Sequence, residues 1–141
     1  MSNTRIMLAT LALGTALAFA GPAFAEKMKA TLDGASEVPA NTSAGKGTAD
    51  IDYDAASKKL TWKLTYSGLS GPATAAHFHG PAEPGKNAGV AVPITGAASS
   101  PAEGSATLTD AQAADLIAGK FYVNVHTAAN PGGEIRGQVT K

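Results

Sequence analysis

Residues 46–66, KGTADIDYDAASKKLTWKLTY, decide the fold class of this chain. Two runs of alternating apolar and polar residues flank the short polar segment 54–57, a pattern typical of a β-hairpin. In the second run, every other side chain points to the same face of a strand. That face carries Leu60, Trp62, Leu64 and Tyr66. We therefore expect it to pack into a hydrophobic core.

The same kind of pattern continues along the chain. Short alternating segments separated by glycine-containing turns indicate an all-β sandwich or barrel. The expected strands cover residues 27–32, 46–53, 59–66, 73–79, 89–95, 103–108, 120–126 and 133–140.

One segment of the sequence departs from the strand pattern. Thr109 as a cap, Gln112 three residues later and Gly119 just past the end are the start and stop signals of a short helix. They predict a helix near 110–118. We expect Leu116 and Ile117 of this helix to turn inward.

The N-terminal residues read as a secretory signal peptide. Arg5 precedes an apolar run, and Ala23-Phe24-Ala25 gives an A-x-A cleavage site, so residues 1–25 are expected to be removed. The apolar run is shorter than the ~20 residues needed to span a bilayer, which disfavours a retained anchor. The expected product is one domain, residues 26–141, without a membrane span, in the periplasm or outside the cell.

Charge and cysteine content exclude several classes of function. The chain has 11 basic and 11 acidic residues, and losing Arg5 leaves 10 against 11, a net charge of −1. Binding to nucleic acid or to an anionic membrane by electrostatic attraction is therefore excluded as a primary role. The absence of cysteine excludes disulfide bonds and thiolate chemistry. About 116 residues suffice to bury a core without such help.

The chain has three histidines, and two of them lie one residue apart. In AHFHG, residues 76–80, strand alternation places His77 and His79 on one face, with Cα atoms roughly 6.5–7 Å apart. Two imidazoles at that spacing can bind one metal ion. In FYVNVH, residues 121–126, the same alternation puts Val123 and Val125 in the core and His126 on the opposite face. The alternative for His77 and His79 is a pair of solvated histidines that bind no metal. The alternative for His126 is a lone histidine on the surface.

The last strand follows the same alternation. Ile135 is expected to face inward and its neighbours Glu134 and Arg136 outward. Val139 is also expected to face inward, and Gln138 outward.

Four segments, AHFHGPA, the spaced GV-x-VPI run, LTDAQAADLIAGKFYVNVHT and NPGGEIRGQV, resemble the CHRD domain, first described in chordin and widespread in exported bacterial proteins. The resemblance covers about residues 28–140. The chain is also more distantly similar to copper/zinc superoxide dismutases. In those Greek-key β-barrels an H-x-H strand and a late histidine bind copper, and an arginine on the final strand guides superoxide.

These resemblances imply a Greek-key β-sandwich or barrel of about eight strands with a copper site. By the second likeness, His77, His79 and His126 match the copper ligands, and Arg136 matches the arginine that guides the anion. A surface ion pair with Glu134 or Asp52 is the alternative role for Arg136. The chain shows no bridging histidine, zinc-ligand cluster or cysteine pair, so a zinc site is not implied.

The ligand chemistry places copper first and leaves the function open. Three neutral imidazoles favour Cu(II) over Zn(II) and leave one coordination position free. Glu83 and Met28 are candidates for a fourth ligand, although we expect them to be solvent-facing or structural.

The expected function is copper handling or superoxide dismutase-like activity, with superoxide as the partner. The alternative is a non-catalytic extracytoplasmic binding or structural module with no functional metal. A zinc hydrolase is disfavoured because no general base is evident. The sequence does not fix the oligomeric state.

Overall fold

The computed structural model describes residues 24–141, so the predicted signal peptide lies outside the described residues except for its last two. The described chain forms eight strands and one helix, all within two residues of their predicted ends. The elements are β1 (Glu26–Asp33), β2 (Lys46–Asp54), β3 (Lys59–Ser67), β4 (Ala73–His79), β5 (Val90–Pro93), β6 (Ala102–Thr107), α1 (Asp110–Ile117), β7 (Tyr122–Thr127) and β8 (Ile135–Gln138).

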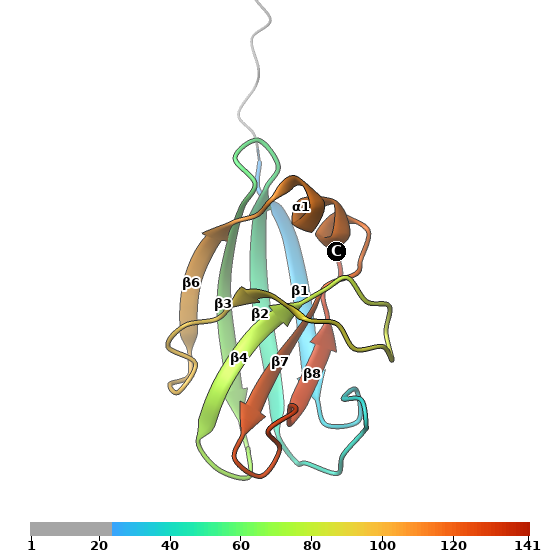
Figure 1. The fold of residues 1–141 in the computed structure, drawn as a ribbon. Helices are drawn as coiled ribbons and strands as arrows, with labels where there is room; N and C mark the ends of the chain where they lie inside the picture. The colour runs from blue at the N-terminus through green and yellow to red at the C-terminus, as the bar shows by residue number, and fades with distance from the viewer. Residues whose placement is uncertain (1–23) are drawn as a thin grey trace, which may run out of the picture.

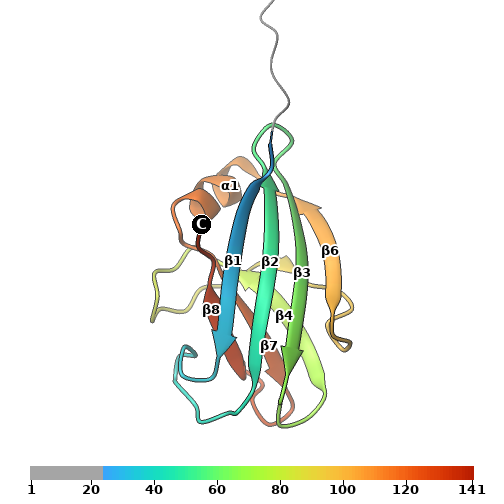
Figure 2. The ribbon, with the colours of Figure 1, turned by 180° about the vertical axis from the view of Figure 1, so that it is seen from behind.

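The strands form one antiparallel sheet in the order β5-β4-β7-β8-β1-β2-β3-β6. The sheet folds over on itself, so that β4, β7 and β8 lie in front of β1, β2, β3 and β6 (Figure 1). Figure 2 shows this second layer from behind. Strand β6 pairs with β3, and β7 pairs with β4. Each return skips two strands, which is a Greek-key connection and confirms the predicted fold class.

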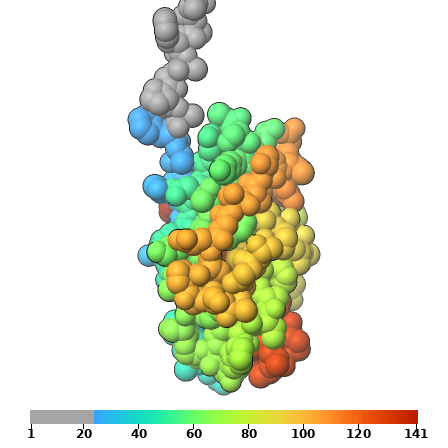
Figure 3. Space-filling model, turned by 90° about the vertical axis from the view of Figure 1, so that its left-hand side faces the viewer, coloured from blue at the N-terminus to red at the C-terminus, as the bar shows by residue number. Residues whose placement is uncertain are grey.

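The two edge strands, β5 and β6, do not pair with each other, so the barrel is nearly but not completely closed. The chain that joins them, yellow to orange in Figure 3, covers this side of the molecule. Ile94 and Ala97 of this connecting chain are buried in the core. The open edge is therefore sealed by packing of side chains rather than by a strand ladder.

Helix α1 covers one end of the barrel (Figure 1). The predicted capping box is present: Gln112 N donates to Thr109 Oγ1, and Gln112 Oε1 accepts from Thr109 N. Gly119 follows the helix with φ +77°. Leu116 is buried as predicted, but the inward prediction for Ile117 was wrong, because its side chain is 42% exposed. Adjacent helix residues lie 100° apart, so a two-turn helix turns one of them away. Within residues 24–141, no helix has the length and apolarity needed to cross a bilayer.

The core lies between the two layers, as the alternation in residues 59–66 predicted. Leu60, Trp62 and Leu64 of β3 are buried, and Tyr66 is partly buried against them. The Trp62 ring meets Phe78 of β4 edge-on, with ring centroids 5.2 Å apart. Phe78 points inward, so its neighbours on β4 point out of the barrel.

Candidate metal centre

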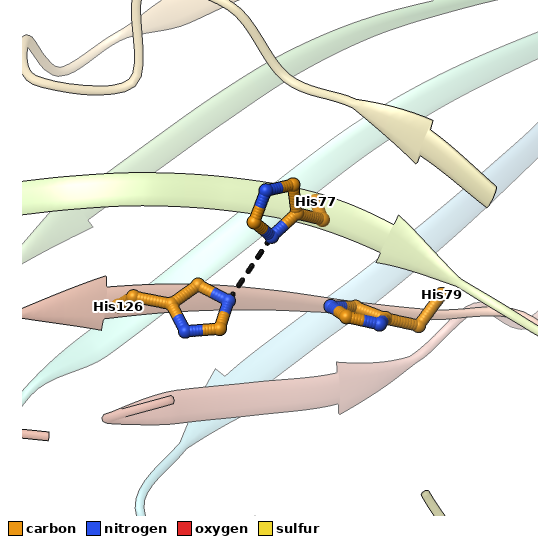
Figure 4. Close-up of side chains that lie close together, drawn as sticks. All are labelled: His77, His79 and His126. Carbon is orange, nitrogen blue, oxygen red and sulfur yellow. Dashed lines mark hydrogen bonds between the residues drawn. The ribbon is translucent and has the colours of Figure 1, made fainter. Parts of the chain in front are cut away.

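The three histidines meet on the outer face of the front layer (Figure 4). His77 and His79 lie on β4, and His126 lies on the adjacent strand β7. The β4–β7 register places His77 opposite Asn124 and His126 opposite Ala75. Antiparallel pairing thus brings together residues 49 positions apart, which alternation within either strand could not establish. In the described part of the chain, this is the one group of three or more potential ligand residues close enough to hold a metal ion.

The ring nitrogens are close enough to share one ion. One ligand nitrogen from each ring lies within 4.8 Å of the others. The closest pair, His77 Nδ1 and His126 Nε2, is 3.1 Å apart. Nitrogens bound tetrahedrally to a metal at ~2.05 Å lie about 3.3 Å from one another. The cluster therefore needs only small side-chain movements to close around an ion.

Two of the rings are held by backbone carbonyls behind them. His126 Nδ1 donates to Pro131 O at 2.9 Å, and His79 Nδ1 donates to Ala88 O at 3.0 Å. A carbonyl oxygen can only accept, so in the neutral rings the proton sits on Nδ1 and the lone pair on Nε2. Such an outer hydrogen bond is the usual way in which proteins orient a metal-binding histidine.

The surroundings favour the neutral, metal-binding form of the His77 and His79 rings. Burial, followed by the neighbouring His126 and His79, lowers the pKa of His77. Burial also lowers the pKa of His79, against smaller opposing effects of its hydrogen bonds. His79 is buried, whereas His77 and His126 are only partly covered. The cluster is therefore open to solvent on the side of His77 and His126.

The wall beside His79 includes two residues, Tyr122 and Asn124, for which the sequence suggested no role. Tyr122 stacks on the His79 ring, with centroids 4.8 Å apart and planes 5° from parallel. The Arg136 guanidinium carbon lies 3.5 Å from the centroid of the Tyr122 ring. Asn124 Oδ1 is 2.9 Å from His79 Nε2. Alternation in FYVNVH puts Tyr122 and Asn124 on the same face as His126, which is the one signal that the sequence offers for them.

The outward direction predicted for Arg136 does not expose the residue to solvent. It points away from the core, as alternation requires, but its side chain is only 2% exposed. The guanidinium donates to Asn87 Oδ1 at 2.9 Å and to Lys86 O, both in the loop between β4 and β5. This loop covers the outer face of β8. Alternation predicts which way a side chain points, but not whether a distant loop covers it.

The other residues expected to face outward from β8 are also covered. Glu134 is fully buried and Gln138 is partly buried. The alternative ion pairs do not form: Asp52 pairs with Lys27, and Glu134 accepts hydrogen bonds from neutral groups.

Neither candidate fourth ligand belongs to the histidine cluster. Met28 is buried in the core, on β1. Glu83 is exposed and lies 3.9 Å from Lys120 Nζ. Both positions agree with the expected structural and solvent-facing roles.

The fold and the cluster together define a Greek-key β-barrel with a candidate metal centre on its outer face. The family model described as CHRD domain matches residues 28–139, so the chain belongs to the CHRD domain family, as its motifs predicted. No curated protein and no solved structure matches the chain. The similarity to copper/zinc superoxide dismutases therefore stays a prediction.

Proposed function

We propose that this protein is an exported copper-binding domain that holds one Cu(II) ion through His77, His79 and His126. The observation that carries the proposal is the anchoring of His79 and His126 by backbone carbonyls. Each anchor uses Nδ1 of its ring, so Nε2 is the nitrogen that the ring can offer to an ion. Solvated histidines on a strand have no need of such orientation.

The donor set supports copper ahead of zinc. By the Irving–Williams order, a site of three neutral imidazoles has a higher affinity for Cu(II) than for Zn(II). The partly exposed side of His77 and His126 leaves space for a further ligand such as water. Bound copper would supply one-electron redox chemistry. The residues of this chain would hold the ion and limit its access to solvent.

Export is the second part of the proposal and rests on residues 1–25. Their basic head, apolar run and A-x-A ending are those of a cleaved secretory signal. The protein would then handle copper in the periplasm or outside the cell. Fractionation that finds the full-length chain in the cytoplasm would contradict this part of the proposal.

Copper titration with histidine variants tests the metal site. We expect one Cu(II) per chain, followed by visible absorption, and at least a tenfold weaker affinity in His77→Ala and in His126→Ala. Thr65→Ala is the control, because Thr65 is exposed on β3 in the other layer. Equal copper affinity in all four proteins would reject the site and favour the non-catalytic module without a functional metal.

Superoxide dismutase-like activity is a finer form of the same proposal, with Arg136 guiding the anion. Its guanidinium already donates to Asn87 and to Lys86 O and lies over Tyr122. For this reason we favour copper handling over catalysis. The test is a superoxide assay on the copper-loaded protein at rising ionic strength. A rate above that of free copper that falls with added salt would support anion guidance and reject our preference.

A further inference from the structure

Glu37, in the segment between β1 and β2, is a buried acid outside the histidine cluster. Glu37 is only 6% exposed to solvent. Its Oε1 atom has no hydrogen-bond partner among the described residues. Buried carboxyl oxygens in folded proteins nearly always have a partner. The isolated oxygen therefore calls for an explanation, and its surroundings provide one.

The carboxyl group of Glu37 faces the side chain of Asn124, and a glycine makes room for both. Gly133 has φ +128°, and a Cβ atom there would lie 2.3 Å from Glu37 Oε1 and 2.8 Å from Asn124 Nδ2. The other end of the same amide, Asn124 Oδ1, is 2.9 Å from His79 Nε2. Asn124 thus lies between the acid and one predicted metal ligand.

A count of hydrogens shows that this arrangement has two states. Neutral His79 uses its proton on Ala88 O, so its Nε2 carries a lone pair and cannot donate to Asn124 Oδ1. If the amide turns, Asn124 Nδ2 donates to His79 Nε2, and Oδ1 faces Glu37. That orientation requires a protonated Glu37 as the donor. The opposite orientation points Nδ2 at Glu37, and an ionised carboxylate accepts that hydrogen bond more strongly than a protonated carboxyl group does.

We propose that the Asn124 side chain is a turning amide that couples metal binding at His79 to Glu37. In the metal-free state the protonated Glu37 donates to Oδ1, and Nδ2 donates to His79 Nε2 and occupies the ligand position. With the lone pair of His79 Nε2 committed to a metal ion, Nδ2 would lose its acceptor, and the amide would turn so that Nδ2 donates to the Glu37 carboxylate. The proton of Glu37 leaves to solvent, one for each ion bound. This inference rests on the proposed copper site.

The charges around Glu37 allow both states near neutral pH. Burial raises the pKa of Glu37 to about 7, while the positive charge of Arg136 and hydrogen bonds from Val38 and Asn124 act in the opposite direction. Arg136 on β8 is the charged group that faces it, and His79 on β4 lies beyond Asn124. The cost of moving the proton in either direction is therefore small.

Proton counting in Glu37→Gln tests the coupling. Calorimetric Cu(II) titrations in two buffers of different ionisation enthalpy give the number of protons released. We expect wild type to release about one proton more than Glu37→Gln below pH 6.5. Between pH 5.5 and 6.5, the Cu(II) affinity of wild type should increase by a factor close to ten times larger than the increase in Glu37→Gln. The reason is that one linked proton changes affinity tenfold per pH unit. The difference between the two proteins counts only the proton that depends on the Glu37 carboxyl group. Glu103→Gln, an exposed acid on β6, is the control.

Measurements on the metal-free protein separate this inference from the copper proposal. We expect the ¹⁵N resonance of His79 Nε2 to follow the titration of the Glu37 carboxyl in wild type and in Glu103→Gln, but not in Asn124→Ala. Equal proton release by wild type and Glu37→Gln, with both binding copper, would overturn the coupling alone. If neither binds copper, the copper proposal fails. A His79 resonance that ignores Glu37 would then overturn the coupling as well.

Discussion

His79 and His126 each donate a hydrogen bond from Nδ1 to a backbone carbonyl, and these two bonds orient the rings of the cluster. The carbonyls belong to Ala88 and Pro131, in the loops that follow β4 and β7. Strand alternation predicted the face on which the rings lie. It could not predict the carbonyls, because loop backbone has no two-residue period.

Glu134 anchors the loop that carries Pro131. Its carboxylate is fully buried and accepts hydrogen bonds from the hydroxyls of Ser43, Ser70 and Thr127, the Ser70 backbone nitrogen and the Asn130 amide. Burial alone would raise the pKa of Glu134, but these hydrogen bonds outweigh it and lower the pKa to about 2. Three loops therefore meet at one ionised side chain.

Glu134→Gln should lower the free energy of unfolding by about 3 kcal/mol at pH 7. The amide replaces one acceptor oxygen by an NH₂ group, which faces hydrogen-bond donors and leaves them without an acceptor. Because its folded pKa lies below the ordinary value, the contribution of Glu134 is present above pH 4.5. It is lost as pH falls towards 2. Urea unfolding at pH 7 and pH 3 measures both effects. A variant as stable as wild type at pH 7 would show that the carboxylate is dispensable.

The junction of β1 and β8 joins the two layers of the barrel. The two strands share one ladder pair, Asp33 with Arg136, and an isolated bridge joins Lys29 to Thr140. A Cβ atom at Gly137 of β8 would lie 2.2 Å from Thr31 O. The glycine thus allows the two backbones to touch where hydrogen bonds are few.

Gly137→Ala should destabilise the fold by about 3 kcal/mol, because the new methyl group must push β1 backbone atoms aside. Gly71→Ala is the matched control, since a Cβ there meets nothing within 4 Å. It should change stability by less than about 0.5 kcal/mol. Chemical denaturation of both variants decides the matter, and equal midpoints would disprove close backbone contact at Gly137.

The stability of the whole molecule should depend on pH in two opposing ways. The pKa of Glu37 is raised from 4.5 to about 7, mainly by burial. Its contribution is therefore fully present below pH 4.5 and is lost as pH rises through 7. The lowered pKa values of His77 and His79 act in the other direction. Their contribution is present above pH 6.5 and is lost as pH falls through the lowered values.

Comparison with Glu37→Gln isolates the first effect. Between pH 4.5 and pH 8, wild type should lose on the order of 3 kcal/mol more unfolding free energy than the variant, because each pKa unit corresponds to about 1.4 kcal/mol. Urea unfolding of the metal-free proteins across this range measures the difference. Parallel curves for the two proteins would mean that folding leaves the pKa of Glu37 unchanged.

The alternation of apolar residues determined the strands, the core face and the outward direction of all three histidines. These properties are local, because they depend on the two-residue period of a single strand and on capping signals such as Thr109 and Gln112. Tertiary structure alone decided that β4 and β7 pair and that Arg136 and Glu134 are covered by loops. It also decided that Glu37 reaches Asn124. Those properties arise from contacts between residues distant in sequence, for which a single strand's pattern has no signal.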